Sequence, residues 1–358
     1  MNQQYGSISY PVLNQLQLTT LSAFRNEINN ATLYRESAAY GMMKAMSTDE
    51  SGWNLEVKPR IRRGNVGAHR GASPINTERR ELYGGGAIEW TEYHAVVTID
   101  NRTLVQNCSM NISQLANMTS WGQVPGESKD KLVDLLGNEM VAHLEDLTDR
   151  LSEDVYGDGT PRRGEPDILE GLGAIYKPNT PYAGIGYKDF GRFRRRGKLS
   201  GTQNWFWNPI FHDFDGKAAK INHYYAAGHD IHRGKRQGDI WVFMPSVHYD
   251  NISLRMEGSK RRNRMASEFG FDEHIQLIHH NMVLFPDDFC QSPDGDENIS
   301  YGFRPMDTRM LFHEGDKMTF HQPVIPDNQF SIIFRVTVTL TIRTKDRARG
   351  MVFQNQAP

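Results

Sequence analysis

Cysteine is scarce in this chain: only Cys108 and Cys290 occur among 358 residues. Two cysteines exclude a disulfide framework and a cysteine-rich metal site, and they suit a reducing compartment. The opening residues Met1 to Tyr5 are polar, so they lack the basic and apolar regions of a cleaved secretion signal. We therefore expect a protein that is not secreted.

Long apolar runs and an excess of one charge are also missing. No segment approaches the roughly 20 consecutive apolar residues that a helix needs to cross a bilayer, so we expect no membrane partner. The chain has 41 basic and 43 acidic residues, for a net charge of −2. This balance excludes a generally basic nucleic-acid binder but leaves room for local basic segments. The length predicts roughly two soluble domains.

The common catalytic motifs are absent: there is no G-x-S-x-G, no P-loop and no G-x-G-x-x-G after a strand. The best candidate for a metal site is the interval from His212 to His232. It contains His212, Asp213, Asp215, His223, His229, Asp230 and His232. Zinc or manganese accepts such ligands, but their spacing matches no zincin motif. We therefore expect that the chain is not an enzyme and binds no cofactor. The alternative is a soluble metal-dependent hydrolase that uses the His212–His232 cluster.

A second acidic stretch runs from Asp287 to Glu297. Its carboxylates could attract calcium, but their spacing departs from that of an EF-hand loop. The stretch therefore predicts a solvated acidic loop.

The clearest helical pattern lies between residues 128 and 156. Its apolar stripe consists of Leu132, Leu136, Met140, Leu144, Leu147, Leu151 and Val155, at helical spacing. About 28 residues at 1.5 Å each predict a rod of roughly 42 Å. Gly137 inside the helix predicts a bend or a close crossing. The polar face is acidic and includes Glu127, Asp130, Asp134, Glu139, Glu145, Asp146, Asp149, Glu153 and Asp154.

Alternation of apolar and polar residues predicts several strands. One covers residues 53–61, and another covers 88–99 with a change of phase between Trp90 and Tyr93 that predicts a bulge. Residues 330–342 alternate over roughly 43 Å, close to the length of the long helix. Short buried strands are expected at 240–244, 275–278 and 282–285. At the N-terminus, residues 1–18 show no clear periodicity of apolar residues, and the apolar spacing in residues 20–46 suggests short helices.

A strongly basic segment, Lys58–Arg80, begins in the first strand and continues into the long connection between the first two strands. It contains seven basic residues and one acid, Glu78, which gives a net charge of +6. Such a segment forms no core of its own, so it is either solvated or lies on an acidic surface. Two smaller basic clusters lie further along the chain. Their members are Arg194, Arg195 and Arg196 in the first and Lys260, Arg261 and Arg262 in the second.

The order of these parts resembles the major capsid proteins of tailed bacteriophages, which have the Hong Kong 97 fold. The local match is strongest at residues 154–160, Asp-Val-Tyr-Gly-Asp-Gly-Thr, and at 168–172, Ile-Leu-Glu-Gly-Leu. Members of this family often close their long helix with such a Gly/Asp-rich turn. The resemblance covers nearly the whole chain.

The resemblance implies an α+β protein with four parts. Residues 1–52 form an N-terminal arm, and 53–100 an extended β-hairpin loop. Residues 101–164 and 326–358 form a peripheral domain with a spine helix at 128–156 and a long antiparallel sheet. Residues 165–325 form a compact mixed α/β axial domain.

The resemblance also implies a mechanical function in the virion. Many copies would assemble in the host cytoplasm, as hexamers and pentamers, into an icosahedral head around packaged double-stranded DNA. Further partners would be a portal and a decoration protein. A separate scaffolding protein is also expected, because the roughly fifty residues before the first strand are too few for the large N-terminal scaffold that some relatives carry. Contacts between subunits would join Arg62, Arg63, Arg70, Arg79 and Arg80 to Glu145, Asp146, Asp149 and Glu153. The two smaller basic clusters would touch the DNA without sequence preference if they face inward.

Overall fold

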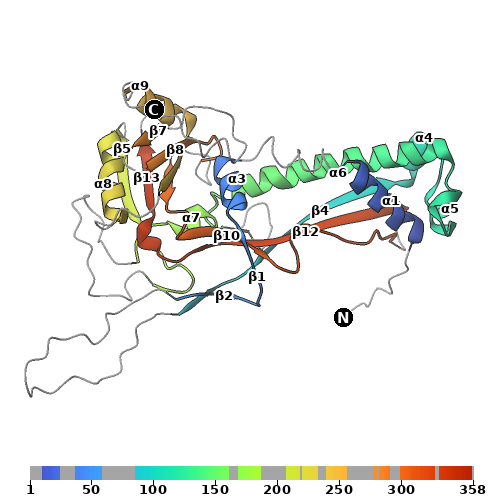
Figure 1. Cartoon of the computed structure of the whole chain (residues 1–358), viewed down its shortest axis with the longest axis horizontal. Coiled ribbons are helices and arrows are strands. Elements are labelled where there is room, and N and C mark those ends of the chain that lie inside the picture. Colours follow the sequence, from blue (N-terminus) through green and yellow to red (C-terminus); the bar gives the residue numbers. More distant parts are fainter. Residues whose placement is uncertain are drawn as a thin grey trace, which may run out of the picture. The chain divides into compact units, whose positions relative to one another are not determined.

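The computed structural model describes residues 10–24, 37–58, 85–160, 168–186, 207–217, 220–232, 239–255, 277–279, 282–290, 299–326 and 330–356. The chain divides into two compact units. Unit 1 comprises residues 1–36, 92–151 and 315–339, and unit 2 comprises 37–91, 152–314 and 340–358. Helix α6 (Gly126–Asp154) and strand β12 (Ser331–Thr344) contribute residues to both units (Figure 1). Among the described residues, no helix is both long and apolar enough to span a bilayer.

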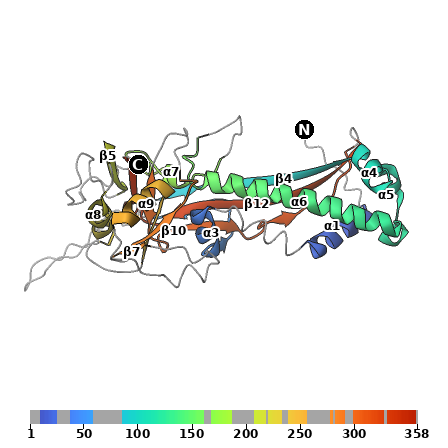
Figure 2. The same ribbon diagram turned by 90° about the horizontal axis from the view of Figure 1, so that it is seen from above.

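Helix α6 confirms the predicted long helix and is 29 residues long. Its apolar stripe is buried from Leu132 to Leu151. In Figures 1 and 2 the helix runs along β12 and β4 (Thr91–Asp100). Gly137 makes the predicted close crossing, because a Cβ atom there would lie 2.4 Å from the ring of Phe24. The ring occupies space that any larger residue would need.

Unit 1 has a core between the helices and the long strands. Its other elements are α1 (Pro11–Ala23), α4 (Asn101–Cys108), α5 (Ile112–Asn117), the 3-10 turn η1 (Trp121–Gln123) and β11 (Thr319–Phe320). Leu13 and Leu16 of α1 pack in one cluster with Leu136 of α6 and Phe334 of β12.

Helix α1 corrects the expectation that residues 1–18 lack a helical period. Its buried face includes the polar residues Gln17 and Thr20 beside three apolar ones, so the stripe is hard to detect. The Thr20 hydroxyl donates to the carbonyl of Leu16 at 2.9 Å and is thereby satisfied inside the core. Polar side chains that bond to their own helix conceal a buried face from hydropathy alone.

Strand β12 confirms the predicted long strand, and its residues Ile332, Phe334, Val336 and Val338 are buried. It pairs with β4, β10 (Thr308–His313) and β11, and β1 (Thr48–Glu50) adds to β10. The prediction of a bulge within one continuous strand near Trp90 is wrong. Strand β3 (Gly86–Ile88) ends there and pairs with β2 (Leu55–Val57), whereas β4 begins at Thr91 and pairs with β12. The change of phase marks the end of one strand and the start of another.

Unit 2 contains a six-stranded mixed sheet in the order β5-β13-β9-β6-β8-β7. Its strands are β5 (Ile210–Lys217), β6 (Ile240–Met244), β7 (Leu277–His279), β8 (Met282–Pro286), β9 (Ser300–Phe303) and β13 (Met351–Gln356). The strands β6 and β8 confirm the predictions at 240–244 and 282–285. Helices α8 (Ile221–His232) and α9 (Ser246–Arg255) contribute to the same core, in which Tyr224, Val242, Leu284 and Phe353 are buried.

The end of α6 is joined closely to α7 (Leu172–Ile175) by backbone contacts within unit 2. The amide of Leu172 donates to the carbonyl of Val155 at 2.7 Å, and that of Ala174 to Gly157 at 3.1 Å. A Cβ atom on Gly171 would lie 2.3 Å from the carbonyl oxygen of Asp154. Only glycine permits this approach, which gives the two short motifs at 154–160 and 168–172 a physical reason.

The remaining elements of unit 2 are α3 (Ala38–Ala45) and the 3-10 turn η3 (Arg347–Arg349). Arg347 is fully buried, and its guanidinium donates to the carbonyl oxygens of Ile175, Lys177 and Thr180. This side chain therefore fixes the segment that follows α7.

Candidate assembly surfaces

The acidic face of α6, defined as Glu145, Asp146, Asp149 and Glu153, is accessible. The side chains of Asp146 and Glu153 are exposed, and those of Glu145 and Asp149 are half-buried. Asp154 was expected on the same face, but it is fully buried at the end of the helix where Gly171 packs on the backbone. The face presents negative charge without a hydrophobic patch, which suits a polar contact more than a core contact.

The arginines expected to meet this face fall outside the described residues. These are Arg62, Arg63, Arg70, Arg79 and Arg80. The expected DNA-facing residues Arg194, Arg195, Arg196, Lys260, Arg261 and Arg262 also fall outside them. Lys58, the first residue of the basic segment, is described: it is exposed and forms an ion pair with Glu56.

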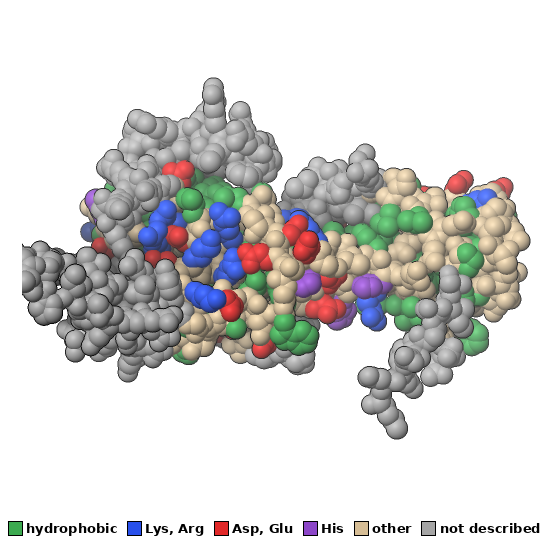
Figure 3. All heavy atoms as spheres, turned by 60° about the horizontal axis from the view of Figure 1, so that its bottom comes forward, with side chains coloured by type: hydrophobic (Ala, Val, Ile, Leu, Met, Phe, Trp, Pro, Cys, Tyr) green, Lys and Arg blue, Asp and Glu red, His purple; other side chains and the backbone are tan. Residues whose placement is uncertain are grey.

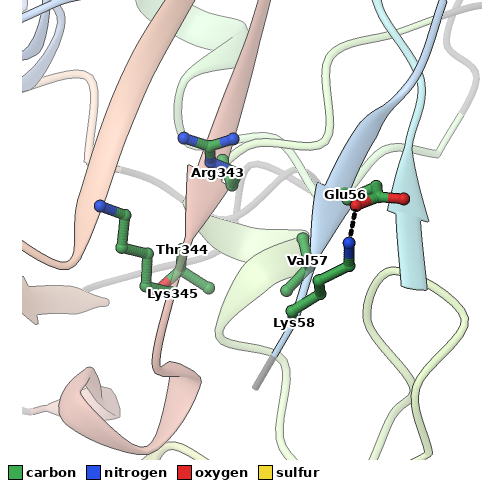
Figure 4. Close-up of a pocket in the computed structure, with 6 residues that line it drawn as sticks. All are labelled: Glu56, Val57, Lys58, Arg343, Thr344 and Lys345. Carbon is green, nitrogen blue, oxygen red and sulfur yellow. Dashed lines mark ion pairs between the residues drawn. The ribbon is translucent and has the colours of Figure 1, made fainter. Parts of the chain in front are cut away.

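A shallow pocket of about 280 Å³ lies in unit 2 beside the end of β2. Its lining residues are Glu56, Val57, Lys58, Arg343, Thr344 and Lys345 (Figure 4). Arg343 forms a two-pronged ion pair with Glu50, through Nη1 to Oε2 at 2.8 Å and Nη2 to Oε1 at 2.5 Å. Figure 3 shows lysine and arginine side chains grouped on one face, with acidic side chains between them.

The side chains that line this pocket are suited to ion pairing and not to catalysis. Three cations and one carboxylate line it, and that carboxylate, Glu56, is paired with Lys58. The hydroxyl of Thr344 accepts from Thr308 at 3.0 Å, so it is engaged within the unit. Two of the three lining cations are therefore already paired with a carboxylate, Lys58 with Glu56 and Arg343 with Glu50.

The histidine cluster does not assemble into a metal site in the part of the chain that the structure describes. His212 of β5 and His223 of α8 lie side by side, with ring centroids 5.4 Å apart. No group of three or more potential ligands gathers among the described residues. Burial lowers the pKa of both imidazoles, because desolvation disfavours their charged form. These rings pack beside Phe214 as part of a wall of aromatic side chains.

Asp287 is a buried polar centre that the sequence did not reveal. Its carboxylate accepts hydrogen bonds from Tyr156 Oη at 2.7 Å and from the backbone amides of Ala39 and Phe289, each at 3.0 Å. The amide of Ser37 donates to Ser152 Oγ at 3.1 Å nearby. The expectation of a solvated loop is therefore wrong at Asp287, which joins the start of α3 to the end of α6.

Burial raises the pKa of the Asp287 carboxyl, although its hydrogen bonds favour the charged form. No spacing in the sequence marks this residue, because its partners lie on segments that are distant along the chain. The neighbouring Asp288, by contrast, accepts a hydrogen bond from the hydroxyl of Ser246 at an exposed position.

No family model matches the sequence, and no curated protein matches it. Solved structures do. The protein chain of the cyanophage A-1(L) capsid asymmetric unit is 11% identical with a TM-score of 0.61, and the match covers 90% of this chain and 93% of that one. The capsid of the native GTA particle matches with 10% identity and a TM-score of 0.52, over 88% and 90% of the two chains. The chain has the Hong Kong 97 capsid fold.

This capsid fold agrees with the elements expected from the resemblance. The long helix, the long strand that runs beside it and the compact mixed sheet are all present. The acidic face lies on the long helix α6, and Lys58 directly follows strand β2.

Proposed function

We propose that this chain is the major capsid protein of a tailed bacteriophage. Copies assemble as hexamers and pentamers into an icosahedral shell around packaged double-stranded DNA. The match to the cyanophage capsid chain supports this proposal most, because it covers nine-tenths of both chains at a TM-score of 0.61. Contact with DNA is electrostatic and independent of sequence, and the portal, scaffolding and decoration proteins are the other expected partners.

In this proposal three of the four sequence-defined parts have mechanical roles. Residues 53–100 form the loop that lies on a neighbouring subunit, residues 101–164 and 326–358 the peripheral domain, and residues 165–325 most of the axial domain. The basic segment Lys58–Arg80 of one copy docks on the acidic face of α6 in another. Each exposed pair contributes only about 0 to 1 kcal/mol, but a shell repeats the contact at every subunit.

Electron microscopy and light scattering of the purified chain test the proposed function. We expect capsomers or closed shells whose mass is many times 40.9 kDa. A chain that stays monomeric at high concentration, both alone and with its scaffolding protein, would contradict a capsid role. A small protein that hydrolyses a substrate only in the presence of zinc or manganese would favour the metal-dependent hydrolase instead.

Charge reversal tests the proposed docking. Changing Arg62, Arg63, Arg79 and Arg80 to Glu together should block or loosen assembly while the far-UV spectrum stays unchanged. Adding Asp146→Arg and Asp149→Arg should partly restore assembly, because the two surfaces again carry opposite charge. The control is Arg335→Glu, at an exposed position of β12 outside the proposed contact. Normal assembly of the fourfold variant at low salt, where screening is weakest, would disprove docking by charge.

A further inference from the structure

Trp53 is the most exposed large hydrophobic side chain among the described residues, at 92% of its full accessible surface. It lies in unit 2, in the turn of residues 51–54 between β1 and β2. Tryptophan is highly buried on average, and exposed tryptophans are concentrated at binding surfaces. Its exposure therefore calls for a partner.

The turn that carries Trp53 is held by specific contacts. The indole nitrogen of Trp90 donates to the carbonyl oxygen of Gly52 at 2.9 Å. Gly52 has a φ of +126°, a conformation that other residues rarely adopt. The Trp90 ring packs edge-on against His313, with centroids 5.1 Å apart, and His313 pairs with Glu50 between β10 and β1. A turn that is fixed before binding loses little conformational entropy when a partner arrives.

The surroundings of this turn are acidic. Asp49, Glu89 and Glu314 are exposed, and the amide of Glu314 donates to the carbonyl of Glu50 at 3.1 Å. Glu89 directly precedes the anchoring Trp90. An accessible indole on a turn whose flanking segments carry carboxylates matches the chemistry of arginine, whose planar guanidinium stacks on tryptophan and pairs with carboxylates.

We propose that Trp53 is the anchor of a contact between copies of this chain and that its occupant is an arginine from the basic segment Lys58–Arg80 of a second copy. This inference rests on the proposed function, because it requires that copies meet. The segment contains six arginines and one acid, so its charge complements the acidic turn. Six arginines suffice for both this contact and the acidic face of α6.

Assembly of the full chain tests the anchor. Trp53→Ala should raise the concentration needed for assembly about 30-fold, the loss typical of an interface hot spot. Its thermal unfolding as a subunit should match the parent, because the removed side chain touches little of its own chain. The control is Met306→Ala, another exposed apolar residue of unit 2 at 58%, which should assemble as the parent does.

A second comparison tests the arginine. Replacing all six arginines of the basic segment with lysine keeps the charge but weakens stacking on the indole. Assembly should weaken several-fold when Trp53 is present and should not weaken further in the Trp53→Ala background. Independent, additive losses would overturn the proposed pairing.

The possible failures are distinguishable. If the parent chain never assembles, the proposed function itself fails. If the parent assembles and Trp53→Ala assembles at the same concentration, the anchor is wrong and the capsid role stands, even if another protein binds the turn. A lower unfolding temperature of the Trp53→Ala subunit would place the partner within the same chain and would also overturn the proposal.

Discussion

The contact between Gly137 and Phe24 allows a prediction whose sign depends on the background. A Cβ atom at residue 137 would lie 2.4–2.5 Å from three atoms of the Phe24 ring, whereas carbon atoms in contact normally lie 3.5–4.0 Å apart. The ring would have to move by about 1 Å. Such overpacking costs typically about 1–3 kcal/mol, and the better helix propensity of alanine returns about 1 kcal/mol. Gly137→Ala should therefore destabilise unit 1 by up to about 2 kcal/mol.

The same substitution should stabilise the protein when the ring is absent. In a Phe24→Ala background only the propensity term remains, so Gly137→Ala should raise the free energy of unfolding by up to about 1 kcal/mol. Urea unfolding of dilute subunits, followed by far-UV circular dichroism, measures all four chains of this cycle. A coupling of about 1–3 kcal/mol between the two positions is expected, because the overpacking cost exists only when the ring is present. If Gly137→Ala stabilises both backgrounds equally, the ring does not pack on α6 and the reasoning is refuted.

Three further predictions concern unit 2 and the shell. Arg347→Ala should lower the free energy of unfolding by about 3 kcal/mol or more in urea, because three carbonyls lose a buried cationic donor, and Arg347→Lys should retain part of that stability. Burial raises the pKa of Asp287, so its contribution to stability is greatest below about pH 4 and falls as pH rises through the folded pKa. Asp287→Asn should accordingly show a flatter dependence of the urea midpoint on pH, and an unchanged slope would contradict this assignment. Residues 59–80 contain no lysine. This part of the basic segment therefore has no side-chain amine that could form a covalent link to a neighbouring subunit. Reducing denaturing gels of particles should show a single band, and a ladder of multimers would contradict this prediction.

Regular periodicity made the long elements predictable. The stripe from Leu132 to Leu151 and the alternation from Ile332 to Leu340 each extend over many turns or pleats, so single exceptions such as Ile333 do not obscure them. The close crossing at Gly137 was predictable because glycine is costly inside a helix. Short elements with polar residues on their buried face were harder to predict. In α1, for example, the buried face includes Gln17 and Thr20, which interrupt the apolar pattern.

The candidate site was less predictable, because its geometry depends on tertiary contacts. Nothing adjacent in sequence distinguishes the buried Asp287 from the exposed Asp288, since Tyr156 and Ala39 decide the burial. Trp53 gave no signal either, because its exposure follows from a turn that Trp90 fixes from 38 positions away. The acidic face of α6 was visible from helical spacing, but the loss of Asp154 to the interior was not.

The internal position of β13, between two strands that precede it in the sequence, has a consequence for the order of synthesis. This strand, Met351–Gln356, fills the space between β5 and β9 in the sheet of unit 2. Until residue 356 leaves the ribosome, both neighbours expose unpaired edges, and the core around Phe353 lacks its ring. Contacts between residues so distant in sequence form late. A ribosome that stops before β13 therefore releases a chain without a finished sheet, and under the proposed function such truncated chains would be excluded from assembly.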